Sequence, residues 1–174
     1  MSVDLLLLEH INIKNAFLDS LMIFVTKLGN LGMIWIAIGV ILIFFNKYRR
    51  CGLFMLISLL ATFLIGEGLI KNIVCRPRPF IENNNIQLLI EAPLSYSFPS
   101  GHSASSFSAA WTIIKFNKVL GILSIALAAL IAFSRIYLCV HYPSDVISGM
   151  LLGIIVSQIT YTILKKYSKG YVLT

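Results

Sequence analysis

The feature that most constrains this chain is a series of apolar runs separated by short polar connections. A helix that crosses a bilayer needs about 20 mainly apolar residues, or about 17 at the short end of the range. Five runs are candidates for such helices: 31–45, 51–75, 102–116, 119–138 and 144–166. A weaker sixth candidate, 13–28, carries Asp19 and Lys27. Together the runs predict an all-α integral membrane bundle of about six transmembrane helices.

Composition supports a membrane location. The chain has 174 residues, of which 58% are hydrophobic and only 12% charged. Soluble globular domains carry about 25% charged residues, so this chain is too apolar to have a wholly aqueous surface. The length predicts a single domain, 1–174. The first ten residues, MSVDLLLLEH, lack the basic start and the apolar length of a secretory signal. They predict instead a short amphipathic helix at the membrane surface.

The positions of the basic residues indicate how the chain is oriented in the membrane. A net charge of +7 in a soluble protein would suggest nucleic acid, but here the positive groups lie between apolar runs, so no nucleic-acid partner is expected. In a six-helix arrangement one side receives most of them: Lys14, Lys47, Arg49, Arg50, Lys115, Lys118, Lys165, Lys166 and Lys169. That side is predicted to be cytoplasmic, with both termini. Arg76, Arg78 and Arg135 fall on the opposite side, where topology does not explain them.

The first of three chemically suggestive segments is KNIVCRPRP, at 71–79. It overlaps the start of the polar stretch 76–100. Lys71 is predicted near the end of a helix. Pro77 and Pro79 stop that helix, because proline lacks an N–H and restricts the residue before it. Arg78 then lies on a stiff turn. Taken alone, the segment is equally compatible with a snorkelling lysine and ordinary loop arginines.

The second segment is FPSGHS, at 98–103. Ser100 is a suitable N-cap for the next helix, and Gly101 allows a ligand to approach the backbone closely. Free N–H groups and the positive end of the helix dipole favour an anion such as phosphate at this position. His102 would lie beside that anion. Taken alone, the segment could be a plain capping turn with an interfacial histidine.

The third segment is SRIYLCVHYPSD, at 134–145. Arg135 is predicted near the outer end of the fifth helix, and Pro143 suits the first turn of the sixth. His141 lies just before that turn and Asp145 lies within it. The helix dipole favours an ionised Asp145, which can hydrogen-bond one ring nitrogen of His141 and leave the other free to attack. Taken alone, the pair could be a loop histidine and a capping aspartate.

The three segments together indicate a functional site, because all of them are predicted at helix ends on the same side of the membrane. Ionisable groups within a membrane protein are costly and usually functional. The set supplies a nucleophile, an orienting carboxylate, a second acid or base and several cations, which phosphoryl transfer requires. Asp145 is the only carboxylate in the segments, so no metal and no cofactor is expected. The cations would do the work that magnesium does in many phosphoryl-transfer sites.

The spacing KxxxxxxRP, then PSGH, then SRxxxxxHxxxD resembles the three-part signature of the type 2 phosphatidic acid phosphatase superfamily. Every defining position matches. The resemblance implies that His141 attacks phosphorus to form a phosphohistidine, that Asp145 orients His141, and that His102 protonates the leaving group and then activates water. It also implies that the phosphoryl oxygens are bound by Lys71, Arg78, Ser100, Gly101 and Arg135.

The family also implies a lipid phosphate or diphosphate substrate. The charge distribution places the predicted site on the extracytoplasmic face. Undecaprenyl diphosphate is the first expectation, and phosphatidylglycerophosphate and phosphatidic acid are the alternatives. A vanadate-dependent haloperoxidase shares such a pocket, but those relatives are larger and soluble. A non-catalytic lipid-binding or transport protein is the alternative of another class. No obligatory protein partner is evident.

Two further features have mainly structural interpretations. Glu67 lies four residues before Lys71, on the same helix face, and is predicted to hold that lysine in place. Gly149 and Gly153 form a GxxxG pattern, which permits close contact between helices. This pattern is predicted to act in packing within the bundle rather than in dimerisation.

Overall fold

The protein is described here by a computed structural model, in which residues 4, 8 and 15–168 are placed. Over these residues the chain is helical and contains no strand, so the all-α prediction is confirmed. The predicted amphipathic helix at the N-terminus lies almost wholly outside the described residues. The elements, in chain order, are α2 (Ala16–Leu28), η1 (Asn30–Gly32), α3 (Met33–Phe44), α4 (Arg49–Phe63), η2 (Leu64–Ile70), α5 (Lys71–Val74), α6 (Pro79–Glu82), α7 (Gly101–Phe116), α8 (Lys118–Tyr137) and α9 (Pro143–Ser168).

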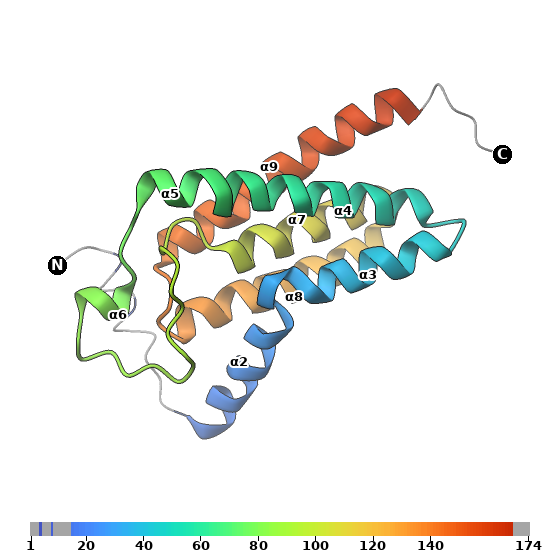
Figure 1. The fold of residues 1–174 in the computed structure, drawn as a ribbon. Helices are drawn as coiled ribbons and strands as arrows, with labels where there is room; N and C mark the ends of the chain where they lie inside the picture. The colour runs from blue at the N-terminus through green and yellow to red at the C-terminus, as the bar shows by residue number, and fades with distance from the viewer. Residues whose placement is uncertain (1–3, 5–7, 9–14, 169–174) are drawn as a thin grey trace.

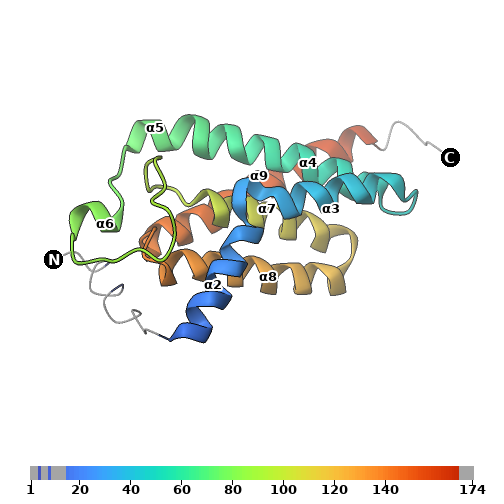
Figure 2. The ribbon, with the colours of Figure 1, turned by 60° about the horizontal axis from the view of Figure 1, so that its bottom comes forward.

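Helix α7 is the centre of the bundle, and α4, α8 and α9 pack around it (Figures 1 and 2). Its sequence explains this position, because the first half is built from serine and alanine, whose small side chains let neighbouring helices approach. Ala104, Ala109 and Ala110 are buried. Ala109 and Ala110 lie in one core cluster with larger side chains from α4, α8 and α9. Ser103, Ser106 and Ser108 of this helix are buried too. Two of them hydrogen-bond to α3 and α4, Ser106 to Trp35 and Ser108 to Thr62.

The GxxxG pattern of α9 lies against α7. A Cβ atom at Gly149 would collide with the carbonyl oxygen of Ser100, and one at Gly153 would collide with that of Ala104. Both glycines therefore let the two helix backbones come into contact. The prediction that this pattern serves packing within the bundle is confirmed.

Three helical segments are long and apolar enough to cross a membrane: Arg49–Glu82, Lys118–Tyr137 and Pro143–Tyr167. A fourth candidate is the pair Ala16–Leu28 and Asn30–Phe44, whose two halves are bent by 43°. Large apolar side chains such as Phe44, Leu60, Ile122 and Ile155 are exposed on these helices. The chain is thus a multi-pass membrane protein, with three or four candidate spans among the described residues.

The helix that begins at Arg49 continues through η2 and α5 as one rod (Figure 1). Residues 64–70 form a π-helix, in which Glu67 lies. The rod ends at Cys75, which adopts a left-handed conformation with φ 48°, two residues before Pro77. The end of this rod, the start of α7 and the α8–α9 connection all lie at the same end of the bundle (Figures 1 and 2).

We expect Gly153→Ala to lower the free energy of unfolding by about 1–3 kcal/mol, because the added methyl group must force α7 and α9 apart. Gly68→Ala is the matched control, since an added Cβ there meets no atom within 4 Å. Thermal unfolding of the purified protein in detergent measures both variants. Equal midpoints for the two variants would contradict the close packing of α7 on α9.

Candidate active site

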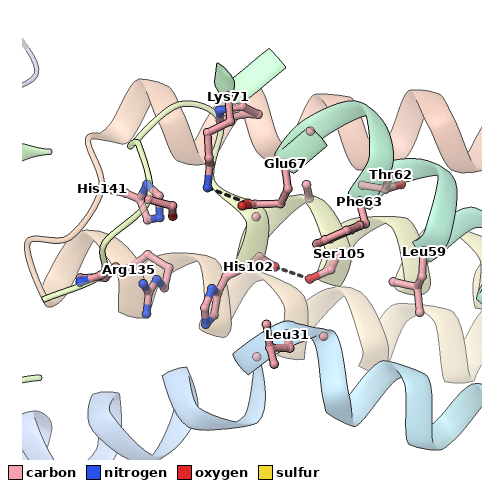
Figure 3. A pocket seen from close by; sticks show the side chains of 18 of the residues that line it. Leu31, Leu59, Thr62, Phe63, Glu67, Lys71, His102, Ser105, Arg135 and His141 are labelled. Carbon is pink, nitrogen blue, oxygen red and sulfur yellow. Dashed lines mark hydrogen bonds and ion pairs between the residues drawn. The ribbon is translucent and has the colours of Figure 1, made fainter. Parts of the chain in front are cut away.

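The three segments identified in the sequence meet around one cavity of about 560 Å³. Figure 3 shows side chains entering it from different elements. Lys71 and Glu67 come from the rod, His102 from α7, Arg135 from α8, and His141 from the α8–α9 connection. Six predicted site residues line the cavity: Lys71, Arg78, Gly101, His102, Arg135 and His141. The remaining two, Ser100 and Asp145, are fully buried beside it.

Asp145 lies in the first turn of α9 and fixes the ring of His141. Its Oδ2 atom lies 3.6 Å from His141 Nδ1. The same oxygen accepts hydrogen bonds from the Tyr142 N–H at 3.0 Å and the Ser97 hydroxyl at 2.5 Å. The other ring nitrogen, Nε2, lies 3.3 Å from Arg78 Nη1. His141 is therefore oriented with Nδ1 toward the carboxylate and Nε2 toward the cations.

The protonation state of His141 suits a nucleophile. Burial lowers the pKa of His141 to about 3. The nearby guanidinium groups of Arg135 and Arg78 act in the same direction, whereas the adjacent Asp145 carboxylate acts in the opposite one. The imidazole is thus neutral at ordinary pH. With Nδ1 protonated and facing Asp145, Nε2 carries the lone pair and faces the Arg78 guanidinium, which can donate to it.

Arg76 supports Asp145 from the opposite side, a role that the sequence did not reveal. Its Nη1 atom donates to Asp145 Oδ1 and to the Ser144 hydroxyl, both at 2.7 Å. Its Nη2 atom pairs with Asp4 at 2.8 Å. The guanidinium also lies 3.9 Å from the ring centroid of Tyr142. The only sequence signal was that topology left Arg76 unexplained.

Arg78 joins the 76–100 loop to the turn that carries His141. Its Nε atom donates to the Ser95 carbonyl at 2.7 Å, and Nη1 donates to the Val140 carbonyl, also at 2.7 Å. The Nη2 atom donates to Ser95 Oγ and to the Tyr96 carbonyl. These bonds hold a buried guanidinium at the site, next to His141.

Arg135 and Lys71 carry most of the remaining positive charge. Each is only 4% exposed. Arg135 donates from Nη1 to Thr26 of α2, but its buried Nε atom has no hydrogen-bond partner among the described residues. A buried donor without a partner is costly, so this site is suited to an anion. Lys71 Nζ has the Glu67 carboxylate at 2.6 Å.

His102 lies in the first turn of α7, against the break between α2 and α3. Its Nε2 atom is 3.0 Å from Asn30 Oδ1. Gly29 packs so closely on the ring that an added Cβ would lie 2.7 Å from His102 Cδ2. Asn30 and Gly29 are partners that the sequence did not predict, because they lie between two apolar runs, in a stretch with no motif.

Ser100 caps α7 rather than lining the cavity. Its hydroxyl oxygen accepts from the Ser103 N–H and hydroxyl. Its own N–H donates to the carbonyl of Asp145 at 3.0 Å. Ser100 thus ties the start of α7 to the start of α9, and its role in binding phosphate stays a prediction.

The rest of the cavity is apolar and runs between α3 and α4. Its lining there comprises Leu31, Ile36, Leu56, Leu59, Leu60 and Phe63. Figure 3 shows Phe63 and Leu59 farther along the helices than the charged groups, with Leu31 near His102. The cavity therefore has a cationic end and an apolar end. In the described part of the chain, no three His, Cys, Asp or Glu side chains are grouped as a metal site would require.

Known proteins share this sequence pattern and fold. A sequence profile described as PAP2 superfamily matches residues 51–169. An undecaprenyl-diphosphatase of Sulfolobus acidocaldarius is 37% identical over 153 residues, which cover 87% of this chain and 73% of the relative. The crystal structure of Aquifex aeolicus LpxE has a TM-score of 0.83 at 28% identity, covering 93% of this chain and 96% of that one.

A second solved structure is a PAP2 type phosphatidylglycerolphosphate phosphatase from Bacillus subtilis. It has a TM-score of 0.75 at 28% identity, covering 94% of this chain and 85% of that one. The resemblance inferred from the three segments is therefore confirmed.

We expect the nuclear magnetic resonance signals of the His141 ring to show no protonation above about pH 5, because the site holds its pKa well below the usual value of about 6.5. Arg78→Gln should raise the pKa of His141 by about one pH unit by removing an adjacent positive charge. Arg50→Gln, an exposed change in the first turn of α4, is the control. An unperturbed His141 pKa in the native protein would contradict this electrostatic description.

Proposed function

Because this chain belongs to the PAP2 superfamily and is a membrane lipid phosphatase, we propose that it hydrolyses undecaprenyl diphosphate to undecaprenyl phosphate and phosphate. The observation that carries the proposal is the two-part cavity. Its cationic end suits a phosphate, and its apolar end between α3 and α4 suits a hydrocarbon chain. The Sulfolobus acidocaldarius relative, which bears the name of this activity, supports the choice of lipid.

The proposed reaction begins with attack of His141 Nε2 on the terminal phosphorus. A P–N bond forms as the P–O bond to the lipid phosphate breaks. His102 gives a proton to the departing oxygen. Lys71, Arg78 and Arg135 bind the phosphoryl oxygens, with the first backbone N–H groups of α7. Asp145 stabilises the imidazolium that forms on His141.

The second step removes the phosphoryl group from the enzyme. Water attacks phosphorus, the P–N bond breaks, and His102 accepts the proton from water. Phosphate leaves and His141 returns to its neutral state. The same two residues thus act in both steps, with His102 as acid first and as base second.

A second candidate substrate is phosphatidylglycerophosphate, with phosphatidic acid as a related monoester. The Bacillus subtilis structure, a phosphatidylglycerolphosphate phosphatase, favours this group. These lipids present a phosphate monoester, whereas undecaprenyl diphosphate presents a second phosphate beside the reactive one. Release of phosphate from a panel of these lipids in mixed micelles ranks the candidates. A non-catalytic binding protein would bind them without turnover.

The proposed orientation places the site on the extracytoplasmic face. The α3–α4 turn, the α7–α8 turn and the end of α9 lie at the end of the bundle opposite the site (Figures 1 and 2), and they carry lysines and arginines. Positive residues favour the cytoplasmic side. The six-helix arrangement, with both termini in the cytoplasm, further requires α2 and α3 to cross separately. The competing arrangement is one broken crossing. The contacts of the N-terminal part favour it, because Asp4 pairs with Arg76 and Asp19 accepts from the Tyr137 hydroxyl, both at the site end of the bundle. The face that holds the N-terminus distinguishes the two arrangements.

We expect His141→Ala to abolish phosphate release, because the proposed nucleophile is lost. With the native enzyme, rapid quenching of a reaction on ³²P-labelled lipid should trap a label that is stable to base and labile to acid, as a phosphohistidine is. Arg50→Ala should retain both turnover and the trapped label. Equal phosphate release by native protein and His141→Ala would contradict the mechanism.

We expect activity to persist in excess EDTA. Three cationic side chains are proposed to neutralise the charge that a divalent ion neutralises at many phosphoryl-transfer sites. The measurement is phosphate release before and after EDTA treatment, with a magnesium-dependent phosphatase as the positive control for chelation. Loss of activity that a divalent ion restores would contradict the prediction.

A further inference from the structure

Glu67 is the one carboxylate among the residues that line the cavity, and it lies within the cationic end. Its Oε1 atom lies 2.6 Å from Lys71 Nζ. The same atom lies so close to Gly101 that an added Cβ would collide with it. Figure 3 shows the carboxylate of Glu67 pointing toward Lys71, over the start of α7. An acidic group thus lies where the phosphoryl oxygens are proposed to bind.

The local backbone places Glu67 there. Residues 64–70 form a π-helix, and such turns re-aim side chains and often occur at functional sites. Asn72 stabilises the turn, because its Nδ2 atom donates to the carbonyls of Glu67 at 3.2 Å and Gly68 at 2.9 Å. The side chain of Glu67 itself is less constrained. It is 29% exposed, and Lys71 is its one hydrogen-bond partner within the described residues.

We propose that the Glu67 carboxylate is an internal anion that occupies the phosphate position beside Lys71 and Gly101 in the empty enzyme, and that it makes the site select lipid-anchored phosphates over free phosphate. The inference rests on the proposed phosphatase function. Glu67 is a specificity-determining residue here, not a catalytic one. It compensates the charge of Lys71 while the site is empty, and substrate displaces it.

The selectivity follows from how each ligand reaches the site. A phosphate bound to a lipid is delivered within the bilayer, where anchoring gives it a high effective concentration at the cavity. Its chain also gains contacts along the apolar lining between α3 and α4. Free phosphate has neither advantage and must displace Glu67 from solution. Competition from the Glu67 carboxylate therefore weakens binding of free phosphate, including the released product, more than it weakens binding of the lipid substrate.

The test compares Glu67→Gln with Glu91→Gln, which removes the same charge from an exposed position of the 83–100 loop. Binding of inorganic phosphate is measured by the rise in thermal unfolding temperature with phosphate concentration, which needs no turnover. Glu67→Gln should bind phosphate about tenfold more tightly than the native protein, the scale of one competing charge contact in a partly exposed site. Glu91→Gln should match the native protein.

A kinetic measurement tests the selectivity. The ratio of kcat/KM for p-nitrophenyl phosphate, a soluble monoester, to kcat/KM for the lipid substrate should rise about tenfold in Glu67→Gln. Glu67→Ala serves as the second variant if Glu67→Gln does not fold. Phosphate binding that is unchanged or weaker in the Glu67 variants, or an unchanged ratio, overturns the proposal. Native protein that binds phosphate but releases none from any lipid phosphate would instead refute the proposed function, and the binding comparison would still report on Glu67.

Discussion

The arrangement of the site depends on one buried charge, the carboxylate of Asp145. A fully buried carboxylate is tolerated only where charged and hydrogen-bonding partners surround it. Here the partners come from three separate parts of the chain: Arg76 from the end of the rod, Ser97 from the long loop, and His141 with the Tyr142 N–H from the α8–α9 connection. The hydrogen bonds and ion pairs to this carboxylate hold the three parts of the chain together at the polar end of the molecule.

Packing at the centre of the bundle brings the two histidines to the same end. The small side chains of α7 and the glycines of α9 allow these helices to touch, and Ser100 bonds to the Asp145 carbonyl where both helices begin. His102 therefore enters the cavity from the start of α7, and His141 from the connection just before α9. The connection is held in place by the hydrogen bonds of Asp145 and Arg78, as catalysis by pre-positioned charges requires.

The helices and the motif residues were predictable from the sequence, because apolar runs and short motifs are local signals. The helix spanning 119–138 was predicted within one residue of α8, and the residues of the three segments converge as the topology implied. What the sequence could not supply were contacts between distant segments. Arg76 and Asp145 are 69 positions apart, and Asn30 and His102 are 72 apart. The π-helix at 64–70 also has no local signature, since its apolar pattern is compatible with an ordinary α-helix.

The balance of charge in the cavity explains why an anion belongs there. Lys71, Arg78 and Arg135 lie around one small space whose remaining walls are largely apolar, and like charges in such surroundings repel strongly. Asp145 compensates the cations from behind His141, and Glu67 compensates Lys71 from within the cavity. The buried Nε of Arg135 still lacks an acceptor among the described residues. In the proposed reaction, a bound phosphoryl group would supply both the missing negative charge and the missing acceptor. The groups proposed to accelerate the reaction would then also be those that the substrate stabilises.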